Sequence, residues 1–313
     1  MYKVFVYYVS KNTFVPTAYC TNAILPLLTI RAIKTQSNTI LFLQTNPNDN
    51  MKTYYYTDEL NDDFAKSKNK ITPKTIDKDY KYIHDNALYK TGSFVLYRLI
   101  ATPVAFLYNK LFRGCTVKNR KALRKIKGGF FLYGNHTHGV GDVFTPSLVV
   151  FPRANKVIAN ANGVSMPIIG KVTPMLGAMP LPSTIAATRN FLEAMKTSIN
   201  NGQVISIYPE AHIWPYYNKI RPFTDSSFAY PMKLNTPVVA ICTTYRKRKI
   251  FKRLPPLATV TVSDPFYPKD FADKTELRNK VYEFMTAVVE KEQSVEYIKY
   301  IKKESTDENC NSL

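Results

Sequence analysis

Short apolar runs bounded by glycine or polar residues recur through the second half of the chain. The first, 130–133 (FFLY), follows Gly128 and Gly129 and predicts a short buried strand. Further runs of this kind predict strands at 156–161, 203–210, 237–245 and 257–266.

Two other stretches have the spacing of amphipathic helices. In 185–202 apolar residues recur at helical spacing and a glycine ends the pattern. These apolar residues are Ile185, Phe191, Leu192 and Met195. Residues 273–293 predict a closing helix with Thr275 as its N-cap. Because strands alternate with helices, the pattern predicts an α/β fold with a central mixed β-sheet flanked by helices.

The first half of the chain differs in pattern. Residues 1–50 hold little charge and show neither a sustained helical period nor a secretory signal pattern. Residues 57–92 are polar and lysine-rich, which predicts helical or irregular structure. The segment 94–112 (FVLYRLIATPVAFLYNKLF) is apolar but interrupted by Arg98, Pro103, Asn109 and Lys110. It falls short of the roughly 18–20 uninterrupted apolar residues of a membrane span. A helix packed on the domain and an amphipathic helix at a membrane surface are both compatible with it.

These patterns divide the chain into four segments. We predict a dispensable or irregular extension at 1–50, with Met51 as a candidate start of the functional protein. A helical N-terminal segment with an amphipathic membrane-surface helix follows at 51–114, then an α/β domain at 115–300 and a polar tail at 301–313.

The composition narrows the classes of molecule that the chain is expected to bind. Lys and Arg outnumber Asp and Glu by 43 to 23, a formal net charge of +20, which favours an anionic partner such as an acidic lipid surface. Basic clusters at 118–127 and 245–253 are expected to face solvent, and no nucleic-acid-binding motif occurs, so nucleic acid is not an expected partner. The four cysteines form no CxxC pair, which argues against a disulfide framework or structural zinc site.

Two loops carry the candidate chemistry. The sequence "GNHTHGVGD" follows the first predicted strand and holds His136, His138 and Asp142. A histidine can accept a proton near neutral pH, and a carboxylate on its other nitrogen fixes its tautomer. Gly139 and Gly141 are expected to allow the sharp turn that brings imidazole and carboxylate together.

The second loop, "YPEAHIWP", follows a later predicted strand and holds Glu210 and His212. In α/β folds, active residues gather in the loops beyond strand ends, so the two loops are expected to meet. A metal site is an open alternative, because the histidines and carboxylates of both loops could supply a ligand set of the catalytic zinc type.

Together, "NHTHGVGD", "YPEAHIWPYYNKIRPF" and "NTPVVAI" resemble the ordered motifs of the lysophospholipid/glycerolipid acyltransferase family, of the 1-acylglycerol-3-phosphate acyltransferase type. The resemblance covers roughly residues 95–265. It implies that His136 is the general base, that Asp142 orients it, and that Asn135 belongs to the same block. Tyr208, Pro209 and Glu210 match the block that shapes the acceptor pocket.

The chain departs from the family pattern at three points. Five residues separate His136 from Asp142, where the family has four; His136 is favoured over His138 because it follows Asn135. Ser183 stands where the family has an arginine, so Arg189 is a candidate substitute. Ala211 and His212 replace the Gly-Thr of the family, and Arg221 is the nearest downstream arginine. The predicted substrate-binding residues are Asn135, His138, Arg189, Tyr208, Pro209, Glu210, His212 and Arg221.

The implied function is transfer of a fatty acyl group from acyl-CoA or acyl-carrier protein to the hydroxyl of a lysophospholipid, in phospholipid biosynthesis. A thioester is already activated, so the implied reaction requires no cofactor or covalent intermediate. The expected location is the cytoplasmic face of the cell membrane, with peripheral or monotopic attachment to an anionic surface. The alternatives are a His/carboxylate metallohydrolase and a non-catalytic basic lipid-binding protein.

Overall fold

The computed structural model describes residues 3–10, 13–20, 51–64, 72–167 and 169–303. The chain divides into two units, Met1–Met51 and Lys52–Leu313. In the first unit, β1 (Lys3–Ser10) and β2 (Thr13–Cys20) form an antiparallel pair. This pairing differs from the irregular extension that the sequence predicts. That residues 1–50 are dispensable stays a prediction.

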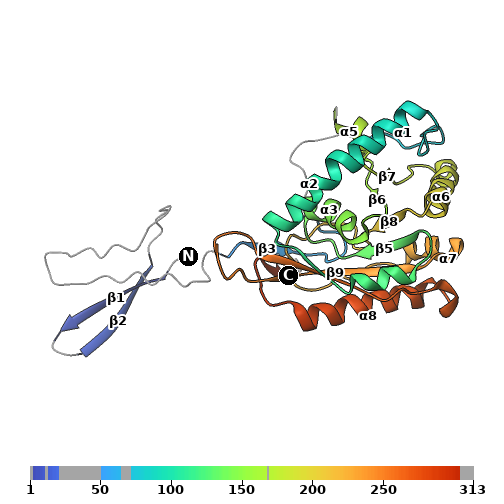
Figure 1. Ribbon diagram of the computed structural model, residues 1–313. Helices are drawn as coiled ribbons and strands as arrows, with labels where there is room; N and C mark the ends of the chain where they lie inside the picture. Colours follow the sequence, from blue (N-terminus) through green and yellow to red (C-terminus); the bar gives the residue numbers. More distant parts are fainter. Residues whose placement is uncertain (1–2, 11–12, 21–50, 65–71, 168, 304–313) are drawn as a thin grey trace, which may run out of the picture. The chain divides into compact units, whose positions relative to one another are not determined.

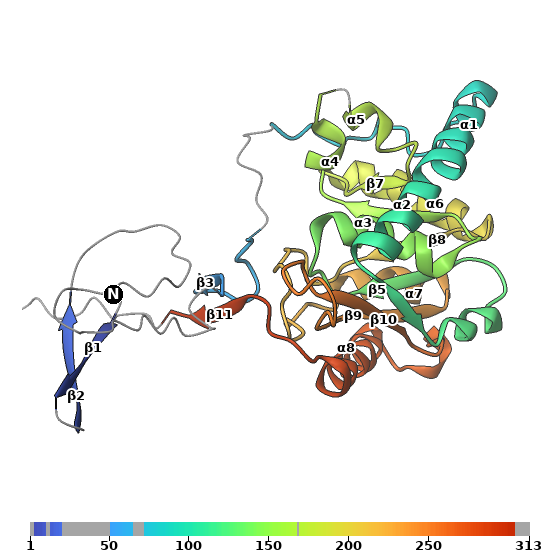
Figure 2. The ribbon, with the colours of Figure 1, turned by 60° about the vertical axis from the view of Figure 1, so that its left-hand side comes forward.

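A seven-stranded mixed sheet forms the centre of the second unit, with the order β4-β10-β9-β5-β8-β6-β7 (Figures 1 and 2). The β9–β10 pair is antiparallel, and the other neighbouring strands are parallel. The strands are β4 (Thr116–Lys118), β5 (Phe130–Gly134), β6 (Asn155–Ala159), β7 (Ala178–Pro180), β8 (Val204–Ile207), β9 (Val238–Arg246) and β10 (Leu257–Val262). The predicted α/β class with a mixed central sheet is confirmed.

The strand β5 is the centre of this sheet and places the first loop. All five of its residues are buried, and it pairs in parallel with β9 on one side and β8 on the other. Since parallel strands end at the same edge of a sheet, the loops after β5 and β8 leave the sheet side by side. These are the two loops that carry the candidate chemistry.

Helices cover both faces of the sheet (Figure 1). On one face, α6 (Ile185–Asn200) and α8 (Lys274–Glu292) bury Phe191, Met195, Leu277 and Val281 against the sheet, together with η4 (Ser226–Phe228). On the other face, α3 (Gly139–Val150) and η3 (Arg120–Lys125) supply the second core cluster. The remaining short helices are α4 (Asn162–Ser165), α5 (Ile169–Val172), α7 (Ala229–Leu234) and η5 (Pro268–Asp270).

One continuous helix of 26 residues, Ala87–Phe112, runs over α3. It consists of α1 (Ala87–Phe94), η1 (Val95–Ala101), α2 (Thr102–Leu107) and η2 (Tyr108–Phe112), of which η1 and η2 are π-helical. By length and composition it could cross a membrane, although no uninterrupted apolar run of that length occurs. The π-helical stretch precedes Pro103, which lacks an N–H, and the Thr102 hydroxyl donates to the carbonyl of Tyr97 at 2.7 Å.

The two faces of this helix have different environments. Thr102, Ala105 and Asn109 are buried toward the domain. Apolar side chains along the other side stay in solvent: Leu88, Phe94, Val95, Leu99, Ile100, Val104, Leu107, Leu111 and Phe112 are all exposed. We call this set the apolar helix face.

A second, two-stranded sheet joins the segment after Met51 to the end of the described chain. Here β3 (Thr53–Tyr56) pairs in parallel with β11 (Lys299–Lys302). Rings from both strands surround the buried Trp214, whose ring centroid lies 5.0 Å from that of Tyr300 and 4.7 Å from that of Tyr56. The segment 51–114, predicted to be helical, therefore begins with a strand, and its described part before Ala87 holds no helix.

Two local expectations are wrong. The N-cap of α8 is Asp273, not Thr275, because its Oδ1 accepts from the N–H groups of Thr275 and Glu276, each at 2.8 Å. Ile185 does not join the apolar face of α6, since it lies at the first position of the helix and is 94% exposed.

Candidate active site

The structure brings His136 and Asp142 together. Nδ1 of His136 lies 2.9 Å from Oδ2 of Asp142, and the carboxylate is buried while the imidazole keeps 18% of its side-chain surface exposed. His136 lies two residues after the end of β5, and Asp142 lies in the first turn of α3, where the positive end of the helix dipole stabilises a carboxylate. With Nδ1 held by the carboxylate, Nε2 is the nitrogen left to exchange a proton with a substrate.

Two further groups hold the pair of His136 and Asp142, which we call the dyad, in position. The ring of Tyr208 stacks on that of His136 with centroids 4.5 Å apart, and its hydroxyl donates to the backbone carbonyl of Asp142. Burial and the nearby Asp142 charge raise the pKa of Tyr208, so its hydroxyl remains a donor at neutral pH. Oδ2 of Asp142 also accepts from the backbone N–H of His138 at 2.8 Å.

The second histidine of the loop caps the helix that follows it. His138 is the N-cap of α3, and its Nδ1 accepts from the N–H of Gly141 at 3.0 Å. Burial, with the nearby Arg113 cation, lowers the pKa of His138 and favours the neutral ring that such a bond needs. The predicted substrate-binding residue His138 is therefore a helix cap in this structure.

A buried arginine that the sequence analysis missed supports the same turn. Nη1 of Arg113 donates to Oγ1 of Thr145 at 2.6 Å and to Oδ1 of Asn109 at 3.0 Å. Its guanidinium packs so closely on Gly141 that a Cβ there would lie 2.5 Å from Cζ. Arg113 was missed because it ends an apolar stretch and belongs to no motif.

Gly141 therefore allows close packing with Arg113 and does not provide the sharp turn that the sequence predicts. Neither Gly139 nor Gly141 has a positive φ, and both lie in the first turn of α3. Thr137 and His138 lead into α3, with His138 in an extended conformation, and the Thr137 Oγ1 bonds the buried Tyr245 hydroxyl at 2.8 Å.

The glycine pair allows a matched test. Gly141→Ala should lower the free energy of unfolding by about 1–3 kcal/mol, because the new methyl forces the buried Arg113 to move. It should also lower activity, since Asp142 is the next residue. Gly139→Ala is the control: its Cβ would meet only Cδ1 of Ile213, at an ordinary 3.7 Å. Urea unfolding of both variants gives the comparison. Equal stabilities would show that Arg113 does not constrain this turn.

The loop after β8 supports His136 from the other side. Glu210 is buried, and its Oε2 accepts from the backbone N–H of His136 at 3.0 Å. Burial raises the pKa of Glu210; the Arg221 cation and the N–H of His136 oppose that shift. Because the carboxylate holds backbone groups, Glu210 is a positioning residue here and does not line an open acceptor pocket.

Arg221, predicted to contact the acceptor, is enclosed in the same way. Its side chain is 1% exposed, and its Nη2 lies 3.6 Å from Oε2 of Glu210. The guanidinium donates to the carbonyls of Glu59, Glu210 and His212. A buried guanidinium with these partners cannot reach a headgroup without rearrangement, which differs from the predicted clamp.

Of the three other predicted binding residues in these loops, Asn135 holds the backbone of a neighbouring strand. Asn135 is buried and exchanges two bonds with β9: its Nδ2 donates to the carbonyl of Thr243 at 3.0 Å, and its Oδ1 accepts from the Thr243 N–H at 2.7 Å. Pro209 continues the loop between Tyr208 and Glu210 and is partly exposed. His212 is partly exposed, and its Nδ1 lies 3.7 Å from Oδ2 of Asp63.

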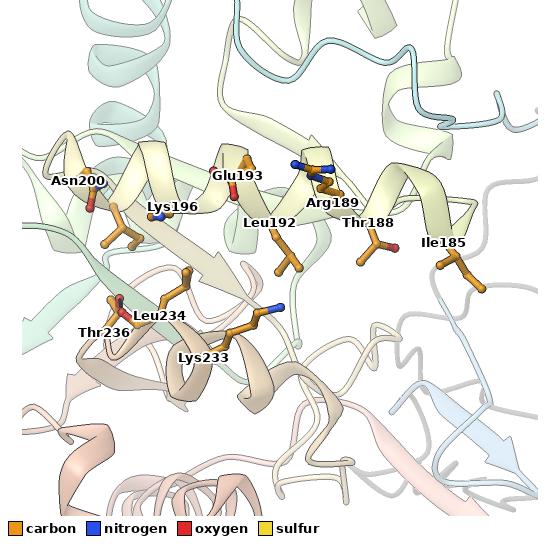
Figure 3. A pocket seen from close by; sticks show the side chains of 11 residues that line it. Ile185, Thr188, Arg189, Leu192, Glu193, Lys196, Asn200, Lys233, Leu234 and Thr236 are labelled. Atoms are coloured by element: carbon orange, nitrogen blue, oxygen red, sulfur yellow. Dashed lines mark hydrogen bonds between the residues drawn. The ribbon is translucent and has the colours of Figure 1, made fainter.

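Arg189 is not brought to the dyad. It lies on the outer side of α6 and lines a cavity of about 570 Å³ together with Lys196, Lys233 and Leu234 (Figure 3). None of the described residues that line this cavity belongs to the loops of His136 or Glu210. Its role in substrate binding stays a prediction.

The metal alternative finds no donor set in the described residues. Among them, no three His, Cys, Asp or Glu side chains cluster in a way that could hold a metal ion. His136, His138 and Glu210 are instead engaged with Asp142, Gly141 and backbone N–H groups.

The arrangement matches general-base chemistry. A partly exposed imidazole is oriented by a buried carboxylate, which is stabilised by a helix N-terminus and the backbone N–H of His138. Two exposed valines of α3, Val140 and Val143, flank Asp142 and give the adjoining surface an apolar character.

Comparison with known proteins agrees with the acyl-transfer chemistry that the sequence motifs imply. Residues 114–244 match the family model described as Acyltransferase. Over these residues, which are less than half of the chain, the sequence is similar to the acyltransferase family. The predicted resemblance is thereby confirmed. No curated protein matches the chain. Similar solved structures include the crystal structure of the 1-acyl-sn-glycerophosphate acyltransferase PlsC from Thermotoga maritima, with a TM-score of 0.46 and 18% identity over 67% of this chain and 96% of that one. This likeness is too weak to add to the assignment.

The residues that match the acyltransferase model contain the pair of His136 and Asp142. The matched residues run from the approach to β4 as far as β9 and include both loops, with His136, Asp142 and Glu210. The long helix before residue 114 and the helix α8 lie outside the match.

Proposed function

We propose that this acyltransferase moves a fatty acyl group from acyl-CoA or acyl-carrier protein to the hydroxyl of a lysophospholipid, with 1-acylglycerol-3-phosphate as the first acceptor to test. The observation that carries the proposal is the 2.9 Å contact between His136 and Asp142 within the acyltransferase domain. The reaction belongs to phospholipid biosynthesis.

The mechanism needs one proton carrier. Nε2 of His136 takes the proton from the acceptor hydroxyl as its oxygen attacks the thioester carbonyl carbon. The resulting imidazolium is stabilised by Asp142. When the tetrahedral intermediate collapses, the C–S bond breaks and the thiolate leaves, taking the proton back from His136. The products are the acyl ester and the free thiol, and the enzyme returns to its starting state.

An acceptor and donor panel tests the proposal. Lysophosphatidate and monoacylglycerol differ by the phosphate, and acyl-CoA and acyl-carrier protein differ by the carrier. We expect ester formation with lysophosphatidate and little with monoacylglycerol, measured by mass spectrometry of the lipid product. Transfer to neither would contradict acyl transfer to lysolipids. Equal transfer to both would contradict recognition of the acceptor phosphate. Arg221 is too deeply buried to supply that recognition in this structure.

We also propose peripheral attachment at the cytoplasmic face of the cell membrane through the apolar helix face. A basic loop at 246–256 extends it: Ile250 and Phe251 are 74% and 73% exposed among Lys247, Lys249, Lys252 and Arg253. Arg248 ties this loop to the helix by donating to the carbonyl of Phe112. Apolar side chains that insert among basic ones are typical of interfacial attachment, with each cation near an anionic surface worth about 1 kcal/mol.

Vesicle binding tests the attachment. Leu99 and Leu111 are 63% and 66% exposed on the apolar helix face. Leu99→Glu with Leu111→Glu should weaken sedimentation with phosphatidylglycerol vesicles by at least about tenfold, because each leucine contributes about 1.5–3 kcal/mol on burial. Ile185→Glu is the control, since Ile185 is 94% exposed on the opposite side of the sheet. Equal losses in both variants would count against a specific membrane-facing surface.

A further inference from the structure

A second cavity lies at the edge of the sheet opposite to His136. It has a volume of about 550 Å³ and is bounded by the first residues of β6, the turn after α6, and the N-terminal half of the long helix. Since β6 and β8 run parallel to β5, their amino ends lie at the edge away from the loop of His136. The cavity is therefore separate from the dyad.

The lining of this cavity is cationic. Four cationic residues contribute to it, and none of the described residues that line it is an Asp or Glu. These residues are Lys90, Arg98, Arg153 and Lys156. Without a carboxylate in the lining, the excess positive charge is available to an anionic ligand.

Lys156 is the central group of this lining. It lies on β6 inside the sheet, and among the described residues no hydrogen bond or ion pair is found for its ammonium. Burial lowers the pKa of Lys156, with no carboxylate opposing the shift. Lys156 is half-buried, so its ammonium is partly desolvated without a carboxylate partner, and an anion that enters the cavity would pair with it.

The other cations are differently engaged. Arg153 adds positive charge to the cavity, but its Nη1 and Nη2 already donate to the carbonyls of Leu123 and Ile126. Lys90 pairs with Asp85 at 3.5 Å on the exposed rim. Arg98 donates to the carbonyl of Pro152 at 2.6 Å, also at the rim.

The position of the cavity indicates the kind of anion. Phe94 lines the cavity and is also a member of the apolar helix face, 59% exposed. The stacked rings of His84 and Tyr89, with centroids 3.9 Å apart, complete an aromatic wall. A ligand with a phosphate at Lys156 could thus lay acyl chains along the apolar helix face.

We infer that this cavity is a second lipid site, which takes the phosphate group of an anionic phospholipid at Lys156, apart from the substrates of His136. The site would give the enzyme a preference for anionic membranes beyond general charge attraction. It needs no catalytic activity and is independent of the acyl-transfer proposal.

The test uses dihexanoylphosphatidylglycerol below its micelle concentration, because it is neither the proposed acceptor nor its product. Inorganic phosphate and dihexanoylphosphatidylcholine are the comparison ligands. We expect dihexanoylphosphatidylglycerol to bind at least tenfold more tightly than either, by calorimetry. Lys156→Met should weaken its binding at least tenfold, while Lys156→Arg should retain it within threefold. Equal binding to wild type and Lys156→Met would overturn the site, and equal affinity for inorganic phosphate would overturn the lipid assignment.

A second measurement uses the wild-type chain, so it holds even if Lys156→Met fails to fold. Trace acetylation followed by peptide mass spectrometry reports the reactivity of each lysine. Dihexanoylphosphatidylglycerol should protect Lys156 at least fivefold and leave the exposed Lys121 unchanged. Protection of neither lysine, or of both to the same extent, would overturn the proposal.

Discussion

Replacing His136 with alanine is expected to lower kcat for acyl transfer by about 10²–10⁴-fold, the usual contribution of a positioned general base. The physical reason is the contact between His136 Nδ1 and Asp142, which leaves Nε2 as the proton acceptor. KM for the thioester should change little, because the imidazole acts on the acceptor hydroxyl. Steady-state kinetics of purified variants, with thermal unfolding as a check on folding, measures both parameters.

The sequence supplies a matched control two residues away. His138→Asn keeps a side-chain acceptor for the Gly141 N–H, and asparagine is a favoured N-cap residue, so α3 should remain intact. We expect this variant to stay within about tenfold of wild type, since capping groups contribute about 1 kcal/mol to stability. If His138→Asn lost as much activity as His136→Ala, or lost more, the base would be assigned to the wrong histidine.

Asp142→Asn separates the two roles of Asp142, which are to orient the His136 imidazole and to stabilise its positive charge. The amide can still accept from the His138 N–H, but it cannot stabilise an imidazolium as a carboxylate does. We therefore expect a fall in kcat close to that of His136→Ala, and no further loss when both substitutions are combined, because the two residues act as one unit. Independent, multiplying losses would contradict the dyad.

The sequence was sufficient for five strands of the central sheet and for the pair of His136 and Asp142, because both are encoded locally. The apolar run 130–133 predicts β5, and the Asn-His start with a nearby aspartate predicts the loop that follows. The direction of the strands then brings the loop after β8 beside it. Hydrophobic periodicity and one motif were thus enough to predict where His136 lies relative to the sheet.

The roles of the supporting polar residues could not be predicted in this way. Asn135, Glu210 and Arg221 are polar residues in motifs, and such residues suggest substrate contact; in the structure they are buried and bond backbone groups. Whether a polar side chain faces substrate or a backbone carbonyl depends on tertiary burial, which a motif does not contain. The short strands β4 and β7 were missed for a related reason: three residues give no periodicity.

The largest loss of stability is expected from Arg221→Met. This change leaves the Glu210 carboxylate buried without its cation, and it removes the donors to the carbonyls of Glu59 and His212. Breaking a buried ion pair by removal of one partner costs about 3–5 kcal/mol. Urea unfolding should show this loss. The exposed ion pair of Lys280 and Glu283, 2.9 Å apart, is the control, and Lys280→Met should leave the midpoint unchanged.

A double-mutant cycle shows whether the loss comes from the orphaned charge. Glu210→Gln keeps an oxygen that can accept from the His136 N–H but carries no charge, so Arg221→Met should cost less in that background than in the wild type. We expect a coupling of about 1–3 kcal/mol between the two positions. Strictly additive losses would mean that Arg221 stabilises the loop through its carbonyl partners alone.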